Sequence, residues 1–260
     1  MKHQMRRKYR IESLSAATFP GALKVIREAF FQDEAVCIGT EIHKDPEAIE
    51  ELLELCASAA LDGVSLVAVA RQKERYMTPT PFTSMELRYP SPVASDSTEK
   101  TFLDLFEERN TRPSCLSLVH FIKDVEGRCN FFEKYHADCC LDITWLAVLR
   151  EHRGRNLATL LCKLSVDLAK KLRDGPVSTF TVKDCGPKFA YLKTRDVTDK
   201  VPTVCTSIWS SEFTRRIGKK MGFKVEVSVP MSQFVFNGKS YADRLGDESA
   251  FSELVALELA

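Results

Sequence analysis

Hydrophobic and polar positions along the chain follow two different periods. Apolar residues three and four positions apart predict amphipathic helices over residues 22–30, 49–56, 100–109, 115–127, 157–172 and 211–221. β-Branched or alternating runs predict strands over residues 8–13, 64–72, 82–89 and 142–149, with two more within 223–238. Strands and helices mix along the whole length, and no repeat or linker divides it. The pattern predicts one α/β domain over residues 1–260.

The composition excludes several classes of protein. The 260 residues are 44% hydrophobic and 28% charged, which is ordinary for a globular chain and unlike a disordered one. Lys plus Arg is 37 against 36 Asp plus Glu, so the net charge of +1 gives no reason to expect a nucleic-acid partner. No apolar run approaches the roughly 18 residues of a membrane span. The basic tail, residues 1–7, leads into a segment too polar for a signal peptide, so we expect the tail to be solvated.

The nine cysteines do not form the patterns of a metal or redox site. No CxxC pair occurs among them, and none of the five histidines has a ligand spacing such as HxxxH. We therefore expect no metal, and thiols that are reduced and mostly buried, as in a cytoplasmic protein.

The clearest chemical pattern is LAVLREHRGRNLATLL, residues 146–161. A buried strand runs into a short turn that holds Arg153 and Gly154, and a long helix begins within a few residues. The first N–H groups of a helix have no internal partner and carry partial positive charge, so such an end binds phosphate. Gly154 allows a ligand close to the backbone, and Arg153 and Arg155 add positive charge. A tight turn alone also explains a glycine at this place.

The order of these residues resembles the acyl-CoA motif of the GNAT superfamily of N-acyltransferases. That motif reads (Gln/Arg)-x-x-Gly-x-(Gly/Ala), and here it consists of Arg153, Gly154, Arg155, Asn156, Leu157 and Ala158. Asn156 stands in place of a glycine, and Asn tolerates a left-handed backbone better than most residues. The resemblance implies that residues 153–158 bind the pyrophosphate of acetyl-CoA as cosubstrate.

Three further segments resemble the insect-type arylalkylamine N-acetyltransferases of that superfamily. They are FFQDEAV at 30–36, SMELRYPSP at 84–92 and CTSIWSSEFTRRIGKKMGF at 205–223, in the order and spacing of that group. The resemblance implies the GNAT fold: an α/β domain with a mixed central sheet of about seven strands, a splay at the acyl-CoA site and helices on both faces. A basic segment, residues 183–202, is longer than in most members.

Transfer of an acyl group to an amine requires the neutral amine. An alkylamine with a pKa near 10.4 is only about one part in a thousand neutral at neutral pH, so a base must take its proton. In the resembled group this base is the glutamate of the Asp-Glu segment, which matches Glu34. Without the resemblance, the residues alone favour a solvated acidic pair, Asp33 and Glu34, at the end of a helix.

The departing thiolate of CoA needs polar hydrogens near its sulfur. Many GNAT members use a tyrosine at the position that Gly218 occupies here, so that acid is absent. The arylalkylamine group has serines at positions that match Ser210 and Thr214, and the resemblance assigns them this role. Capping of the following helix by Ser210 or Ser211 explains the same residues and is compatible with that role.

The pantetheine arm of CoA is expected beside the strand before the motif. The resemblance places it along the backbone of Leu146, Ala147 and Val148, like an extra strand where the sheet splays. We also expect His152, next to Arg153, to contact a phosphate rather than to act as a catalyst.

The resemblance implies an acetyl-CoA-dependent N-acetyltransferase that acetylates the primary amine of an arylalkylamine by direct attack in a ternary complex. We expect a small-molecule acceptor, no membrane partner, and a cytoplasmic monomer. Phe30, Phe31 and Trp209 are candidates for an amine pocket, although such aromatic residues are usually core. Two alternatives stay open. One is another acceptor (polyamine, agmatine or protein amine) or a longer acyl-CoA, and the other is a catalytically silent CoA-binding module.

Overall fold

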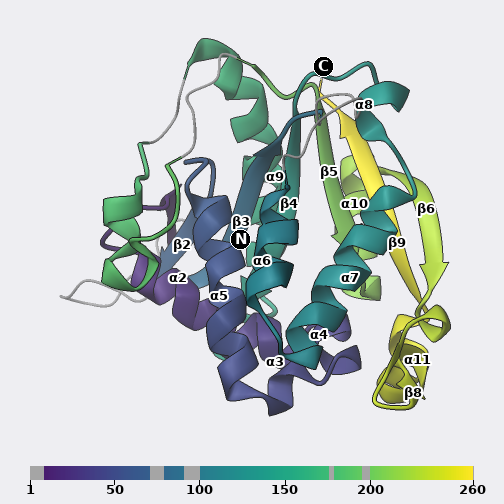
Figure 1. The fold of residues 1–260 in the computed structure, drawn as a ribbon. Helices are drawn as coiled ribbons and strands as arrows, with labels where there is room; N and C mark the ends of the chain where they lie inside the picture. The colour runs from purple at the N-terminus through teal and green to yellow at the C-terminus, as the bar shows by residue number, and fades with distance from the viewer. Residues whose placement is uncertain (1–8, 71–78, 91–99, 176–178, 195–199, 260) are drawn as a thin grey trace.

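A computed structural model describes residues 9–70, 79–90, 100–175, 179–194 and 200–259 of the chain (Figure 1). The predicted basic tail, residues 1–7, lies outside these described residues. A mixed sheet of seven strands runs through the molecule in the order β1-β2-β3-β4-β5-β9-β6. Its strands are β1 (Tyr9–Ser13), β2 (Leu66–Ala70), β3 (Pro79–Arg88), β4 (Cys140–Val148), β5 (Val204–Trp209), β6 (Lys224–Pro230) and β9 (Phe251–Glu258).

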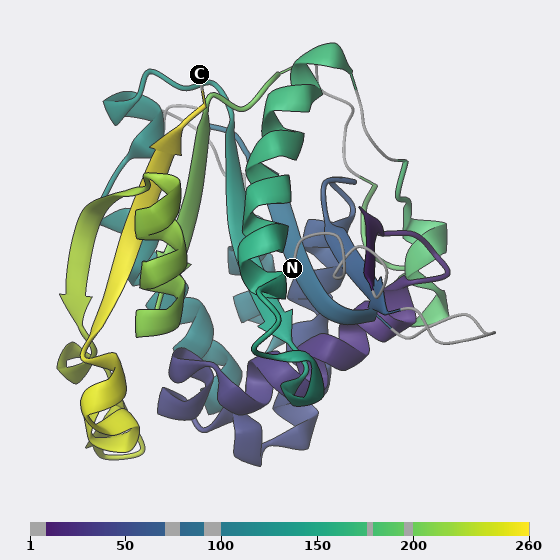
Figure 2. The ribbon, with the colours of Figure 1, turned by 180° about the vertical axis from the view of Figure 1, so that it is seen from behind.

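Helices cover both faces of the sheet, as expected (Figures 1 and 2). On the face seen in Figure 1 lie α2 (Phe19–Val25), α3 (Phe31–Asp33), α4 (Ala35–Gly39), α5 (Pro46–Ala60), α6 (Phe102–Arg109) and α7 (Pro113–Gly127). The opposite face carries α9 (Leu157–Lys171) and α10 (Glu212–Met221). Each layer buries its own hydrophobic cluster against the sheet, because successive side chains of a strand point to opposite faces.

Short elements complete the chain. They are η1 (Ile26–Phe30), η2 (Ile42–Lys44), α8 (Phe131–Lys134), η3 (Arg150–His152), η4 (Leu172–Asp174), η5 (Val182–Cys185), η6 (Pro187–Phe189), η7 (Met231–Gln233), β7 (Val235–Phe236), β8 (Lys239–Ser240), α11 (Tyr241–Leu245) and η8 (Gly246–Ser249). The last five lie between β6 and β9 and extend one end of the molecule, at the lower right of Figure 1.

Strands β4 and β5 separate soon after they begin, and this divergence is the main feature of the sheet. They are parallel and pair only over residues 140–142 with 204–206, whereas β3 accompanies β4 along its whole length. The register between β3 and β4 shifts at Thr144, which reverses the faces toward which the following side chains point. Ile143 therefore packs with one hydrophobic cluster and Trp145 with the other. The predicted splay is present at the predicted strand.

A buried carboxylate holds the two strands together where the divergence begins. Asp142 is 5% exposed and accepts hydrogen bonds from the hydroxyls of Thr206, at 2.6 Å, and Thr144, at 3.0 Å. Arg88 contributes an ion pair at 3.5 Å. One residue further, the Ser207 hydroxyl donates to the carbonyl oxygen of Ile143 at 2.8 Å. Side chains thus replace the backbone ladder as the strands part.

Two of the seven strands were not singled out by the hydrophobic pattern. β5 precedes a serine-rich turn, and β9 has Leu, Ala and Glu at spacings that also suit a helix. Both are strands because they pair with each other over six residues, and β9 also pairs with β6. The two strands predicted within residues 223–238 are found as β6 and the two-residue strand β7.

The basic segment, residues 183–202, packs against α2 and α5 within its first described part, residues 183–194, whereas Lys200 lies over the ring of Tyr89. Phe189 lies 6.0 Å from Phe19, ring centre to ring centre, and Lys188 pairs with Glu50 at 2.8 Å. The hydroxyl of Tyr191 donates to Glu54 at 2.7 Å. The segment therefore adds a layer over the first helices.

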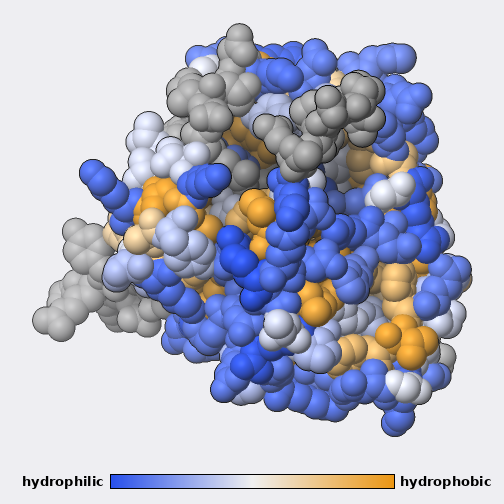
Figure 3. All heavy atoms as spheres, viewed as in Figure 1, coloured by the Kyte–Doolittle hydropathy of each residue, from blue (hydrophilic) through white to orange (hydrophobic). Residues whose placement is uncertain are grey.

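The face shown in Figure 3 is mainly hydrophilic, with separate hydrophobic patches, one of them over the region of β8 and α11 at the lower right. No helix within the described ranges is long and apolar enough to cross a membrane. All nine cysteines are free thiols and eight are buried, as expected.

Replacement of Asp142 is expected to destabilise the fold where β4 and β5 part. Asp142→Ala leaves the buried Thr206 hydroxyl and the part-buried Thr144 hydroxyl without their acceptor and removes one of the two acidic partners of Arg88, which costs about 3 kcal/mol in the free energy of unfolding. The measurement is urea-induced unfolding, with Asp138→Ala as the control because Asp138 is an exposed aspartate just before β4. Equal stability of the two variants would contradict this account of the divergence.

Candidate active site

A cavity of about 1140 Å³ lies where β4 and β5 diverge. Its walls come from the junction of α3 and α4, the second half of β4, the first turn of α9, the end of β5 and α10. Residues of α7 and of the segment before β9 also line it. All twelve residues predicted for catalysis and cofactor binding line this cavity, so the fold brings the predicted site together.

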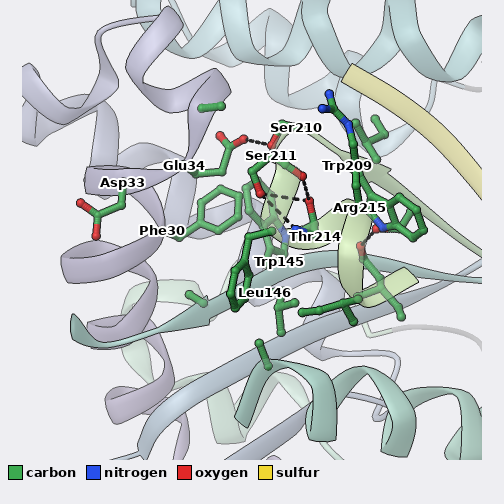
Figure 4. Close-up of a pocket in the computed structure, with 18 of the residues that line it drawn as sticks. Phe30, Asp33, Glu34, Trp145, Leu146, Trp209, Ser210, Ser211, Thr214 and Arg215 are labelled. Atoms are coloured by element: carbon green, nitrogen blue, oxygen red, sulfur yellow. Dashed lines mark hydrogen bonds between the residues drawn. The ribbon is translucent and has the colours of Figure 1, made fainter. Parts of the chain in front are cut away.

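Glu34 points into this cavity and is held through both carboxylate oxygens. It breaks the helix after Asp33, with an extended backbone at ψ 139°, and is the N-cap of α4. One oxygen accepts the N–H of Cys37 at 2.9 Å, and the other accepts the hydroxyl of Ser210 (Figure 4). The carboxylate is therefore fixed in place while its remaining lone pairs stay available.

Asp33 points away from Glu34 in Figure 4, although the two residues are adjacent. Its carboxylate binds the guanidinium groups of Arg150, with Nε at 3.1 Å, and Arg153. The hydrogen bond from Arg150 is the main reason why the pKa of Asp33 lies below its ordinary value. Asp33 is thus not a freely solvated acid, but ties α3 to the turn after β4.

The turn before α9 has the geometry of an anion site. Asn156 adopts the left-handed conformation with φ 58°, which explains how it replaces the glycine of the motif, and Gly154 has φ 70°. The helix that follows is 15 residues long, and the N–H groups of Leu157 and Ala158 in its first turn have no helical partner. The N–H of Arg153 is bonded to the carbonyl oxygen of Arg150, and the backbone of residues 154–158 therefore presents the donors to the cavity.

The two arginines of the turn are engaged with the protein. Arg153 donates through Nε to the carbonyl oxygen of Val148 at 2.9 Å, besides its ion pair with Asp33. Arg155 lies against Tyr9 and His152, and the Tyr9 hydroxyl is 2.8 Å from Nδ1 of His152. Burial lowers the pKa of His152, which favours the neutral ring. Within the described residues, no strand pairs with Leu146, Ala147 and Val148 on the β5 side, as the expected extra-strand pairing requires.

The three hydroxyls after β5 have different partners. Ser211 caps α10, accepting the N–H of Thr214 at 3.3 Å. The hydroxyl of Thr214 donates to the carbonyl oxygen of Ser211 at 2.9 Å. Ser210 does not cap the helix and binds Glu34 (Figure 4). Capping therefore accounts for Ser211 and leaves Ser210 and Thr214 as cavity residues.

Aromatic side chains form one wall of the cavity. Phe30 and Trp145 both line it and meet edge to face, with ring centres 5.0 Å apart. Trp145 carried no signal in the sequence beyond its place in a strand. The expectation that Phe31 lines a pocket is wrong, because it points into the core and is fully buried.

Trp209 lines the cavity from the α10 side. A Cβ atom at Gly218 would lie 1.6 Å from the indole, so only glycine lets Trp209 rest against α10. The close approach of this indole thus explains why Gly218 stands at the position where many GNAT members have a tyrosine.

Metal ligation and thiol chemistry find no support at this site. No group of three or more potential metal ligands occurs among the residues that the structure describes. Cys37, beside Glu34, is fully buried, and burial together with the Glu34 charge raises the pKa of its thiol. The thiol therefore stays protonated and is no nucleophile.

A comparison with protein families finds a match in the middle of the chain. Residues 81–184 match the acetyltransferase (GNAT) family. Enzymes of this family use acetyl-CoA, and the expected superfamily, enzyme class and cosubstrate are thereby confirmed. A search of curated protein sequences finds no match.

Solved structures confirm the fold. Arylalkylamine N-acetyltransferase 2 from Aedes aegypti is 16% identical, with a TM-score of 0.70 over 97% of this chain and 99% of that one. The polyamine N-acetyltransferase of Drosophila melanogaster, which forms N-acetylagmatine, is 13% identical, with a TM-score of 0.65 over 96% and 100%. An agmatine N-acetyltransferase variant is 13% identical, with a TM-score of 0.66 over 97% and 100%.

The ion pairs of Asp33 with Arg150 and Arg153 are expected to stabilise the fold only above acidic pH. Because the folded-state pKa of Asp33 is lowered, its contribution is complete above the ordinary value of 3.8 and is lost as the pH falls through the folded value. The difference in unfolding free energy between wild type and Asp33→Asn, measured by urea titration, should be positive at pH 7 and shrink as the pH falls below 3.8. The exposed Asp138→Asn should show no such difference. A pH-independent difference for Asp33→Asn would contradict the ion-pair assignment.

Proposed function

We propose that this protein is an acetyl-CoA-dependent N-acetyltransferase that acetylates the primary amine of an arylalkylamine by direct attack in a ternary complex. One observation carries the proposal: Glu34 and the anion-binding turn of α9 open into the same cavity. The amine, its base and the acyl donor can therefore meet without a covalent acyl-enzyme. The proposal treats residues 1–260 as one catalytic domain that acts as a monomer.

The cofactor lies along the α9 side of the cavity in this proposal. The turn at residues 153–158 binds the pyrophosphate through the N–H groups of residues 154–158, with the side chains of Arg153 and Arg155 adding charge. The backbone of residues 146–148 pairs with the pantetheine arm along the open edge of β4. Arg153 already bonds to the carbonyl oxygen of Val148, so its side chain shares or yields that oxygen when the arm binds.

Glu34 acts as the general base. The amine nitrogen attacks the thioester carbonyl carbon, a C–N bond forms, and the C–S bond breaks to release CoA as the thiolate. The proton that leaves the amine passes to the Glu34 carboxylate. Ser210 and the N–H of Cys37 fix the direction of that carboxylate, and its charge also attracts the cationic form of the amine.

Ser210 and Thr214 are the polar groups assigned to the departing sulfur. Both line the cavity at the start of α10. A hydroxyl proton rotates freely, so Thr214 can turn its proton from the Ser211 carbonyl to the thiolate. Ser210 has the additional role of binding Glu34.

The charges around the cavity favour an acceptor with a single cationic group. Asp33, Glu126 and Glu212 line the cavity, and each is paired with an arginine. Within the described part of the chain, Glu34 is the lining carboxylate that has no basic partner. A second cation on the acceptor finds no carboxylate free to receive it. The lack of a second free carboxylate distinguishes the proposed acceptor from agmatine and polyamines, which are the substrates named for two of the similar proteins.

The aromatic wall supports the same choice. Phe30 and Trp145 form an aromatic surface against which an aryl ring can pack. Such packing between aromatic rings adds about 1 kcal/mol to the binding free energy beyond the burial of apolar area. The basic segment contributes nothing here, since none of its described residues lines the cavity.

The acceptor is tested by the release of free CoA, detected as thiol, from acetyl-CoA mixed with single amines. We expect kcat/KM for tyramine, dopamine and serotonin to exceed that for agmatine and spermidine by at least about tenfold. A second cation that finds no carboxylate in the cavity raises the activation free energy by roughly 1.4 kcal/mol, which corresponds to that factor. A lysine peptide is expected to be inactive.

Other results would contradict parts of the proposal. If CoA is released only with agmatine, spermidine or the peptide, the proposed acceptor is wrong and the proposed mechanism still holds. No release with any amine, while CoA still binds in calorimetry, would favour a silent CoA-binding module or a longer acyl donor. A chain that does not bind CoA would end the proposal.

Replacement of the base is expected to lower turnover without weakening cofactor binding. Glu34→Gln keeps an acceptor for the Cys37 N–H but cannot take a proton, so kcat with tyramine should fall about 10²-fold or more at pH 7. The deficit should shrink toward pH 10, where the amine is already neutral. The control is Glu28→Gln, an exposed change at the preceding turn. Full turnover of Glu34→Gln across this pH range would remove the assignment.

A further inference from the structure

Glu34 is carried by a helix that is too short to hold its own position. α4 has five residues, and Glu34 is the N-cap at its first end. Helices of one turn are marginal in water and depend on their packing. The direction of the Glu34 carboxylate therefore depends on what holds the other end of α4, at Gly39.

Tyr241 of α11 occupies that position, although it lies about 200 positions further along the chain. A Cβ atom at Gly39 would lie 2.5 Å from Cγ of Tyr241, so the ring rests directly on the backbone of α4. Tyr241 is 2% exposed, and burial raises the pKa of its hydroxyl to about 12. That hydroxyl is 2.7 Å from the hydroxyl of Ser117 in α7. The ring thus fills the space between α4 and α7.

Phe121 and Phe234 also pack against the ring of Tyr241. Their ring centres lie 6.2 Å and 5.6 Å from that of Tyr241, and 4.8 Å from each other. The first comes from α7 and the second from the residues that follow η7. Aromatic packing of this kind fixes a side chain in one orientation.

A second, polar contact joins the same two parts of the chain. Glu41, two residues after α4, has a left-handed backbone with φ 58°. It accepts the side-chain N–H of Asn237 at 2.9 Å and pairs with Arg244 at 3.5 Å. Lys44 and Asn237 lower the pKa of Glu41 to about 2, so it is charged at any physiological pH. Arg244 in turn donates to the carbonyl oxygens of Lys239 and Phe236.

The segment Met231–Ser249 also reaches the cavity itself. Arg244, Leu245 and Ser249 line it together with residues of α7. The segment therefore borders the site, while it contacts no residue of the turn that would hold the cofactor among the contacts described above.

We propose that Tyr241 is a positioning residue for Glu34: its ring, seated on Gly39, fixes α4 so that the carboxylate points to Ser210. The inference rests on the proposed function for its catalytic consequence, but the contact is independent of it. It predicts that a disturbance at Gly39, at the far end of α4 from Glu34, lowers turnover and leaves the cofactor site unchanged.

The test compares two glycine-to-alanine substitutions at helix ends. Gly39→Ala places a methyl group against the Tyr241 ring, whereas Gly127→Ala, at the end of α7, meets nothing within 4 Å. Alanine is the better helix former, so a loss caused by Gly39→Ala cannot come from helix propensity. We expect kcat with tyramine to fall about 10-fold or more in Gly39→Ala, as for a base displaced by a fraction of an ångström, with KM for acetyl-CoA within about twofold of wild type. Gly127→Ala should match wild type.

Two further variants separate positioning from general damage. Tyr241→Phe loses only the bond to Ser117 and should keep kcat within about threefold. The double variant Gly39→Ala/Tyr241→Leu replaces the ring with a smaller side chain and should recover part of the lost kcat. An equal kcat for Gly39→Ala and Gly127→Ala, or a loss shared by kcat and acetyl-CoA binding, would overturn the inference.

Hydrogen exchange gives a readout that does not depend on activity. The amide of Cys37 is bonded to Glu34, so exchange over residues 35–40 should be faster in Gly39→Ala than in wild type and unchanged in Gly127→Ala. If wild type proves inactive with every amine, the proposed function fails and this comparison still decides the role of Tyr241. Unchanged exchange in Gly39→Ala would contradict that role.

Discussion

The divergence of β4 from β5 is the constraint on which the rest of the structure depends. The strands pair over three residues, and then the bulge at Thr144 turns β4 away while Asp142 holds the two strands at their last pair. An open edge inside a sheet leaves backbone groups without partners, and such an edge is stable only where a ligand or side chains satisfy them. Here the Ser207 hydroxyl bonds to the carbonyl oxygen of Ile143 and the Arg153 side chain to that of Val148, and residues 143–148 line the cavity.

The site follows from what meets at this opening. β4 leads into the turn before α9, so the unpaired N–H groups of the helix lie at one end of the cavity. β5 leads into Ser210, which binds Glu34 from a segment near the start of the chain. Two adjacent acids point in opposite directions here: Asp33 binds Arg150 and Arg153, and Glu34 points into the cavity. This arrangement supports acyl transfer within one ternary complex and explains why a single short segment, residues 30–36, carries both acids.

Local patterns predicted those parts of the molecule whose structure is decided locally. The periodic apolar residues of α5, α7 and α9 and the β-branched runs of β2 and β4 are found where the sequence placed them. β9 could not be recognised in the same way, because its composition suits a helix and only pairing with β5 and β6 makes it a strand.

The candidate site also has parts that a local pattern predicts and parts that depend on contacts between distant segments. The turn at residues 153–158 has a local signature, and Glu34 was found through resemblance to a family. The partners that fix these groups lie far away in the sequence: Asp33 with Arg150, Ser210 with Glu34, and Tyr241 with Gly39. No period or motif records such contacts, since they depend on how the elements pack. Trp145 and the segment Met231–Ser249 belong to this group, and only the structure shows that they border the cavity.

The central claim is that one cavity holds the acyl donor and the amine together, with Glu34 between them. A conjugate in which the CoA sulfur is joined through an acetyl bridge to the nitrogen of tryptamine tests it directly. Titration calorimetry should show that the conjugate binds at least about 100-fold more tightly than CoA, because the second contact becomes intramolecular. A conjugate that binds no more tightly than CoA would show that the amine and the cofactor do not share this cavity.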